Sequence, residues 1–276
     1  CARFEKPIVQ EDDKDALRRL NQLTGPFILR RMKSEVLKEL PPKTEKLHRI
    51  ELDEQQRKLY LAAVVDAREK LRAAKPEDKM AVFAVLMRLR EICCDPRLVA
   101  DNWDGGSAKL EACMDLVTAA VEGGHRILLF SQFTSMLELL AKRLDEAGVS
   151  HFTLQGSTPK PVRAELVRRF NSGEADVFLI SLRAGGTGLN LTAADIVIHY
   201  DPWWNVAAQN QATDRAYRIG QRNPVQVYKL IAQDTIEEKI VELQQAKQDL
   251  AETVTGSADG VILSMKPEEL LQLLQW

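Results

Sequence analysis

Two arginines in the segment 209–222 are the side chains of this chain best suited to chemistry. Arg215 and Arg218 are three residues apart, so on a helix both guanidinium groups leave the same face and can converge on one polyphosphate. A solvated helix face is the usual alternative for such a pair. That alternative fits poorly here, because the segment is polar nearly all round while it adjoins a predicted buried sheet.

A glycine cluster precedes the arginines. Gly185, Gly186 and Gly188 fall within four positions, which lets the backbone approach a ligand closely. Successive exposed N–H groups in such a run can form a nest for phosphate. A tight turn without any ligand explains the glycines alone equally well.

Two tryptophans follow the next predicted strand, in the segment Asp201-Pro202-Trp203-Trp204-Asn205. We expect at least one indole to be buried under a packed helix. The other can stack on a base or sugar, a contact worth about 1–3 kcal/mol per stacked base.

The elements that must position these residues alternate in type beyond the glycine-containing loop at 102–106. Short apolar runs are typical of buried parallel strands, and amphipathic segments separate most of them. The expected strands are 126–131, 151–155, 177–181, 196–201 and 225–232, and the expected helices lie near 107–122, 134–147, 160–171 and 203–218. This pattern predicts an α/β fold with a parallel sheet covered on both faces. Ligands in such sheets gather at the carboxyl ends of the strands.

The first hundred residues have a mostly helical pattern and a basic balance. They hold 22 Lys and Arg against 17 Asp and Glu, whereas the remainder holds 16 against 23. Leucines at 17, 20 and 23 predict one helix, Asp53 precedes a second, and 79–94 forms a third. Pro41-Pro42 stops a helix, and the alternation over 44–52 predicts a half-buried strand.

The carboxyl-terminal segment has two further helical patterns. One helix is expected from about Asp234, with Thr235 and Glu238 as a capping-box pair, and a short one from about Pro267.

Composition excludes several classes of protein. The chain is 45% hydrophobic and 28% charged, as in an ordinary globular protein. Its four cysteines contain no CxxC pair and its four histidines show no ligand spacing, so neither a zinc site nor a secreted disulfide framework is expected. No apolar run approaches the ~20 residues of a membrane span. We therefore expect a reducing cytosol or nucleus, no membrane partner, and, from the start at Cys1, a piece of a longer protein.

Four ordered motifs give this chain a specific resemblance. The segments 127–133, 154–158, 180–205 and 211–222 resemble motifs IV to VI of the Swi/Snf-type ATPases of helicase superfamily two. Residues 26–45 and the helix after 53–60 resemble the inter-lobe region and second protrusion of that family. The chain has no GxxxxGK[ST] phosphate loop, which in the family lies in the first RecA-like lobe together with the acidic box for Mg²⁺. It thus resembles the C-terminal, second RecA-like lobe, preceded by a mostly helical region.

The resemblance implies a role for each matching residue. Arg215 and Arg218 would be arginine fingers on the γ-phosphate of ATP, with Gln211 helping to set them. Gly188 and Asn190 would line the nucleotide side of the cleft. Trp204 would reach the groove beside a duplex. The residues expected to touch the DNA backbone are Ser131, Gln132, Gly156, Ser157, Arg183 and Gly185.

The same resemblance implies cofactors, partners and modules. ATP and Mg²⁺ would be held mainly by the first lobe, and the partners would be that lobe, double-stranded DNA and, as a further candidate, a protein cargo on the DNA. The modules would be 1–100 (inter-lobe segment and helical protrusion), 101–233 (second lobe) and 234–276 (brace helices). The whole protein would be a DNA-dependent ATP hydrolase, and this chain alone would be inactive.

Two other functions stay open from the sequence. One is a nucleic-acid or protein binding module whose ATPase elements are vestigial. The other is an RNA helicase of the same superfamily, which the segments 182–191 and 214–221 disfavour. Val206, Arg183 and Tyr217 replace residues more usual in the family, but none of these changes removes a charge from the expected ATP site.

Overall fold

The computed structural model describes residues 13–24, 40–75, 78–182, 184, 188–251 and 267–274. The chain divides into two compact units, Cys1–Glu39 with Asp249–Gly256, and Leu40–Gln248 with Ser257–Trp276. In the first unit the structure describes helix α2 (Lys14–Thr24), which confirms the helix predicted from leucine spacing. The Asp13 carboxylate accepts hydrogen bonds from the amides of Asp15 and Ala16 and caps the first turn.

The second unit is built on one sheet. Its strands, among the described residues, are β1 (Lys43–Ile50), β2 (Ile127–Ser131), β3 (His151–Leu154), β4 (Val177–Ser181), β5 (Ile196–His199) and β6 (Val225–Ala232). They lie in the order β1-β6-β5-β2-β4-β3, and every neighbouring pair is parallel. The predicted parallel sheet is confirmed, and the carboxyl ends of all its strands therefore meet at one edge.

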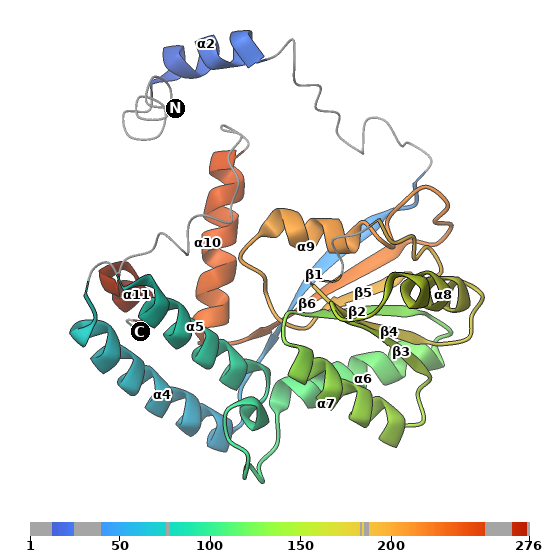
Figure 1. The fold of residues 1–276 in the computed structure, drawn as a ribbon, viewed down its shortest axis with the longest axis horizontal. Coiled ribbons are helices and arrows are strands. Elements are labelled where there is room, and N and C mark those ends of the chain that lie inside the picture. The colour runs from blue at the N-terminus through green and yellow to red at the C-terminus, as the bar shows by residue number, and fades with distance from the viewer. Residues whose placement is uncertain are drawn as a thin grey trace. The chain divides into compact units, whose positions relative to one another are not determined.

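Helices cover both faces of this sheet, as Figure 1 shows. One face packs against α6 (Ala108–Glu122) and α7 (Thr134–Glu146), and the other against α8 (Lys160–Asn171) and α9 (Val206–Thr213). Successive side chains of a strand alternate between faces, so Ile127 and Leu129 join the α6–α7 core while Leu128 and Phe130 join the α8–α9 core.

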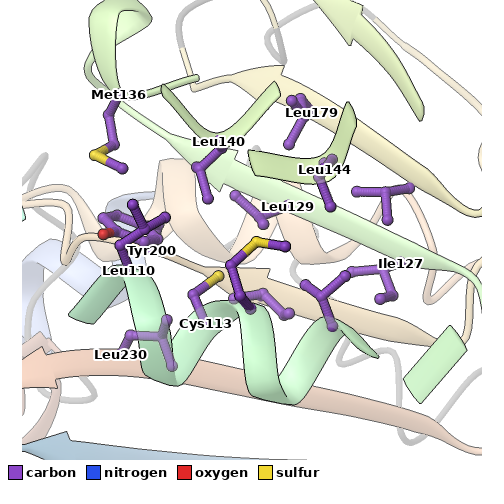
Figure 2. Close-up of a cluster of buried hydrophobic side chains, with 14 of the residues drawn as sticks. Leu110, Cys113, Ile127, Leu129, Met136, Leu140, Leu144, Leu179, Tyr200 and Leu230 are labelled. Atoms are coloured by element: carbon purple, nitrogen blue, oxygen red, sulfur yellow. The ribbon is translucent and has the colours of Figure 1, made fainter. Parts of the chain in front are cut away.

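Figure 2 shows the α6–α7 core, where Leu110 and Cys113 of α6 and Leu140 and Leu144 of α7 lie against the strands. Each of these four side chains is at most 1% exposed. Burial of a leucine-sized side chain contributes about 1.5–3 kcal/mol relative to exposure, so this layer supplies much of the stability of the sheet.

A second, helical core lies beside the sheet. It is formed by α4 (Glu54–Ala73), α5 (Lys79–Cys94), α10 (Ile236–Ala251) and α11 (Pro267–Leu273). A 3₁₀ turn, η1 (Pro96–Leu98), follows α5. The Tyr60 hydroxyl on α4 accepts a hydrogen bond from the amide of Ile236 at 2.7 Å, which joins α4 to the start of α10. The expected division near residue 100 does not coincide with the boundary between the two compact units.

The strand predicted over 44–52 forms as β1, but the predicted half-burial is wrong. Seven of its eight residues are exposed, because β1 is the end strand of the sheet order. Glu45 on β1 accepts hydrogen bonds from Lys43 and Lys229 at 2.7 and 2.8 Å. Partial burial raises the pKa of Glu45, but the two lysines outweigh it and lower the pKa to about 2.

Two helix predictions need correction. Helix α9 ends at Thr213 rather than near residue 218, and the residues after it form turns. At the start of α10, Thr235 and Glu238 both cap backbone amides, but these amides are not the two that a capping box between Thr235 and Glu238 would use. The Thr235 hydroxyl accepts from the amide of Glu237 at 3.2 Å, whereas the Glu238 carboxylate accepts from the amide of Asp234 at 2.9 Å. None of the described helices has both the length and the apolar character of a membrane span.

A buried ion pair joins the two cores. Lys109 on α6 and Glu237 on α10 have no exposed side-chain surface, and the lysine ammonium donates a hydrogen bond to the glutamate. The same carboxylate accepts from the amide of Ala232 at 2.8 Å, and the ammonium lies 5.6 Å from the ring centre of Tyr200. The pair fixes α10 against both α6 and the end of β6.

We predict that Lys109→Met lowers the free energy of unfolding by about 3–5 kcal/mol, because it leaves Glu237 buried without its counter-charge. The double variant K109M/E237L recovers most of that loss, since it buries no charge. Urea unfolding measures both effects. The control is Lys142→Met on the exposed side of α7, for which a change within about 0.5 kcal/mol is expected. Equal losses for Lys109→Met and its control would contradict the prediction.

Candidate functional site

Three loops meet at the carboxyl edge of the sheet, and a turn leads from α9 on one face of the sheet to the amino ends of β5 and β6, where Gln221 binds the carbonyl of Ala194. The loops follow β2, β4 and β5, and the turn follows α9. Backbone hydrogen bonds connect them: the amide of Leu182 donates to the carbonyl of Ser131 at 3.0 Å, and the amide of Leu191 to the carbonyl of Arg215 at 3.0 Å. The topology thus brings together the arginine segment and the loop that contains the glycine cluster.

Arg215 and Arg218 lie in this turn and not on a helix, so the predicted shared helical face is wrong. Arg215 is only 4% exposed, whereas Arg218 is exposed and donates from Nη1 to the carbonyl of Leu189 at 3.4 Å. The turn closes at Gly220, whose φ of 103° favours glycine. Its position is fixed by Gln221, which donates from Nε2 to the carbonyl of Ala194 at 2.7 Å.

The two guanidinium groups nevertheless act on each other electrostatically. Burial lowers the pKa of Arg215, the charge of Arg218 lowers it further, and Asp214 partly offsets both. The folded chain therefore contains a repulsion between two cations in this turn. A bound polyphosphate would relieve that repulsion, so the electrostatics of the turn suit an anionic ligand.

The residues predicted to line the nucleotide are on the surface beside this turn. Gly188, Asn190 and Gln211 are all exposed. The carbonyl of Asn190 accepts a hydrogen bond from Nδ2 of Asn171 at 2.8 Å, which holds this loop to the end of α8. Arg183 and Gly185, expected to touch DNA, lie outside the described residues.

The structure does not support a DNA contact by Ser131. Its side chain is buried, its hydroxyl donates to Oδ1 of Asp201 at 2.6 Å, and the same hydroxyl accepts from the amide of Phe133 at 3.1 Å. Serine at this position therefore orients the loop after β2. Gln132 beside it is half-buried, with Nε2 3.4 Å from Sδ of Met87.

A second predicted DNA contact, the loop after β3, is open to solvent. Gly156 and Ser157 are exposed, and no atom lies near the position of an added side chain at Gly156. Arg163 on α8 donates to the carbonyls of Gly156 and Thr158, both at 2.9 Å, and to that of Gln155 at 3.3 Å. This arginine pins the loop conformation, and no sequence motif had singled it out.

Both tryptophans are half-buried. Trp204 packs against the helical core of α4, α5, α10 and α11, and its ring centre lies 4.9 Å from the guanidinium carbon of Arg90. The carbonyl of Trp203 accepts a hydrogen bond from Nε2 of Gln244 on α10. The expectation of a fully buried indole is therefore wrong: Trp204 is only partly used in packing, and its reach to a DNA groove stays a prediction.

His199, at the end of β5, is a buried group that the sequence did not identify. It stacks on Phe130 with ring centres 5.5 Å apart, and its Nε2 is hydrogen-bonded to Oγ1 of Thr213 at 2.9 Å. Burial lowers its pKa to about 3, with a further contribution from Lys229. A neutral His199 thus ties β5 to the last residue of α9, just before the arginine turn. Within the described ranges, no three His, Cys, Asp or Glu side chains converge as metal ligands would.

Two protein families match the sequence of this chain. Residues 108–220 match the helicase conserved C-terminal domain. Residues 2–98 match the SNF2-related domain. Together the matches include the arginine turn, strand β1 and helices α4 and α5.

Curated relatives of this chain have helicase or SWI/SNF names. An uncharacterized ATP-dependent helicase of Mycoplasma genitalium is 37% identical over 276 residues, which cover 99% of this chain and 26% of the relative. The mouse protein named SWI/SNF-related matrix-associated actin-dependent regulator of chromatin subfamily A member 1 is 36% identical over 279 residues, covering 95% of this chain and 27% of the relative. This chain therefore spans about a quarter of the length of these relatives.

Solved structures agree on the fold. The Sulfolobus solfataricus SWI2/SNF2 ATPase C-terminal domain is 28% identical with a TM-score of 0.69, and the match covers 84% of this chain and 97% of that one. The core of an ATPase of that name, solved in complex with double-stranded DNA, is 30% identical with a TM-score of 0.72, and the match covers 99% of this chain and 58% of that one. The predicted RecA-like fold is confirmed.

The buried state of His199 predicts how stability depends on pH. Its folded pKa of about 3 is below the ordinary value of 6.5, so its contribution is complete above pH 6.5 and is lost as the pH falls from 6.5 towards 3. Between pH 7 and pH 5 the unaltered chain should lose about 2 kcal/mol of unfolding free energy more than His199→Gln, which keeps a hydrogen-bonding group but does not titrate.

Urea unfolding at several pH values measures this difference. His48→Gln, a change at an exposed position of β1, is the control and should retain the pH dependence of the unaltered chain. If the unfolding free energies of His199→Gln and the unaltered chain change equally with pH, a group other than His199 is responsible for the pH dependence.

Proposed function

Since this chain belongs to the Swi/Snf-type ATPases of helicase superfamily two, we propose that it works as their second RecA-like lobe in an ATP-dependent translocase on double-stranded DNA. The observation that carries the proposal is the cation pair in the turn between α9 and β6, where Arg215 is held almost fully buried beside the exposed Arg218. In this proposal residues 1–100 link the lobes and form the protrusion, 101–233 form the second lobe, and 234–276 form the brace.

ATP with Mg²⁺, bound mainly by a first lobe, supplies the phosphoanhydride bond that is hydrolysed. The contribution of this chain to the reaction is electrostatic. Arg215 and Arg218 bring positive charge to the γ-phosphate when the lobes close, a role worth about 10³- to 10⁵-fold in turnover in phosphoryl-transfer enzymes. Gly188 and Asn190 face the nucleotide, and Gln211 orients the arginines. The repulsion between the two guanidinium groups supports this assignment, because a polyphosphate would relieve it.

The carboxyl edge of the sheet is proposed to grip one strand of the duplex. Gly156, Ser157, Gln132, Arg183, Gly185 and Trp204 are the proposed contacts. The Sulfolobus relative solved with double-stranded DNA supports a duplex ligand. Contacts to phosphates carry little sequence information, so movement along DNA should have little sequence preference. A protein displaced from that DNA is a further proposed partner, and the proposed place of action is the bacterial nucleoid or the nucleus.

The finger assignment predicts that Arg215→Ala and Arg218→Ala each lower DNA-stimulated kcat by about 10³-fold or more in the protein carrying both lobes. The measurement is phosphate release with saturating ATP and random-sequence duplex. Arg143→Ala is the matched control, because Arg143 lies near the end of α7 and pairs with Glu111 at 2.8 Å. Turnover of either variant within a few fold of the unaltered protein would remove the finger assignment. A broken phosphate loop in the first lobe would instead favour a binding module with vestigial ATPase elements.

We also expect the 276-residue chain by itself to hydrolyse ATP no faster than a protein-free blank. Two arginines supply charge, but neither positions Mg²⁺ or the attacking water. Phosphate release by the purified chain, with and without duplex DNA, tests this. Turnover that responds to Arg215→Ala in the isolated chain would mean that one lobe is sufficient.

A further inference from the structure

A buried charge connects helix α5 to the end of strand β5. Neither Arg90 on α5 nor its partner Asp201 has exposed side-chain surface. Nη2 of Arg90 donates to Oδ2 of Asp201 at 3.1 Å and to the carbonyl of Pro202 at 2.7 Å. The guanidinium carbon lies 4.9 Å from the ring centre of Trp204 and 5.4 Å from that of Phe133, so it contacts two aromatic rings.

The other carboxylate oxygen of Asp201 binds the segment after β2. Oδ1 accepts from the hydroxyl of Ser131 at 2.6 Å and from the amide of Gln132 at 3.1 Å. One carboxylate therefore joins α5, the loop after β2 and the loop after β5. We call Arg90, Ser131, Gln132, Asp201 and Trp204 the Asp201 cluster.

The Asp201 cluster is poorly explained by stability alone. A buried ion pair is often no more stabilising than apolar side chains of the same volume, because both charges lose their hydration. Arg90 also keeps a buried Nε for which the described residues provide no hydrogen-bond acceptor. A directional ion pair does supply a fixed geometry, because the guanidinium fork and the carboxylate each bind two groups at once.

We infer that Arg90 is a positioning residue, which sets the loops after β2 and β5 in the conformation that binds duplex DNA. The inference rests on the proposed function, because Gln132 and Trp204 are its proposed DNA contacts. Arg90 touches no DNA itself. It acts through Asp201, which holds the Gln132 backbone, and through the face of Trp204. The helical hairpin α4–α5 and these two loops then move as one body when DNA binds.

The test removes both charges together, so that no unpaired charge is left in the core. In the two-lobe protein, R90M/D201N should raise the half-saturating concentration of random-sequence duplex for ATPase stimulation about tenfold, within the range of measured couplings between residues in one network. The half-saturating ATP concentration should change less than about twofold, because the Asp201 cluster does not include the arginine turn. Arg90→Lys keeps a positive charge for Asp201. Its half-saturating DNA concentration should therefore lie between those of the unaltered protein and R90M/D201N.

The matched control is K109M/E237L, which replaces the other buried ion pair; the Lys109 ammonium lies over Tyr200 but donates its hydrogen bond to Glu237 and not to either loop. This control should leave the half-saturating DNA concentration unchanged. A merely structural role for Arg90 would lower the thermal stability of R90M/D201N without raising its DNA requirement, and that result overturns the inference. If R90M/D201N does not fold, Arg90→Lys decides: an unchanged DNA requirement overturns the inference and a raised one supports it.

Failure of the proposed function looks different from failure of this inference. An unaltered two-lobe protein whose ATPase ignores duplex DNA would overturn both. An unaltered protein that responds to DNA, with R90M/D201N responding identically, overturns the positioning role of Arg90 alone.

Discussion

A parallel sheet that is buried on both faces constrains everything else in this protein. Such a sheet needs helices on each side, and its strands all end at the same edge. The six strands described here therefore deliver the loops after β2, β4 and β5 to one place, although their sequences are up to 70 residues apart. The arginine turn after α9 leads away from that edge: His199 holds the end of α9 to β5, and Gln221 fastens the turn to Ala194 at the amino end of β5.

Buried charges then decide how the helical core is attached to the sheet. Lys109–Glu237 joins α6 to α10, and Arg90–Asp201 joins α5 to the loops after β2 and β5. Apolar packing alone is tolerant of small shifts, whereas paired charges in a dry interior are stable in only one arrangement. The two ion pairs therefore tie the helical core to the sheet at two separate points.

The candidate site differs from the usual picture of two arginines on one helical face. Arg215 is buried in a turn and Arg218 is exposed beside it, so each has a separate environment while both charges still interact. A buried guanidinium loses less side-chain entropy on binding than an exposed one, because its rotamers are already restricted. The turn thus presents one rigid and one adaptable cation to the same region.

Local sequence determined the elements. Strand β6 coincides with the apolar run 225–232, and α5 coincides with 79–94, because Asp78 caps its first turn and Asp95-Pro96 ends it. The ordered motifs identified the family and the RecA-like fold. These features depend on residues within a few positions of one another, which a sequence displays directly.

Tertiary structure alone decided which polar residues are buried and with what partner. Arg90 meets Asp201 across 111 positions and Lys109 meets Glu237 across 128, and no local pattern marks either pair. Ser131 has a motif that suggests DNA, yet its hydroxyl is used by Asp201. The exposure of β1 and the end of α9 at Thr213 likewise follow from neighbours in space. The physical reason is that desolvation of a polar group depends on the whole surrounding fold, which no single segment specifies.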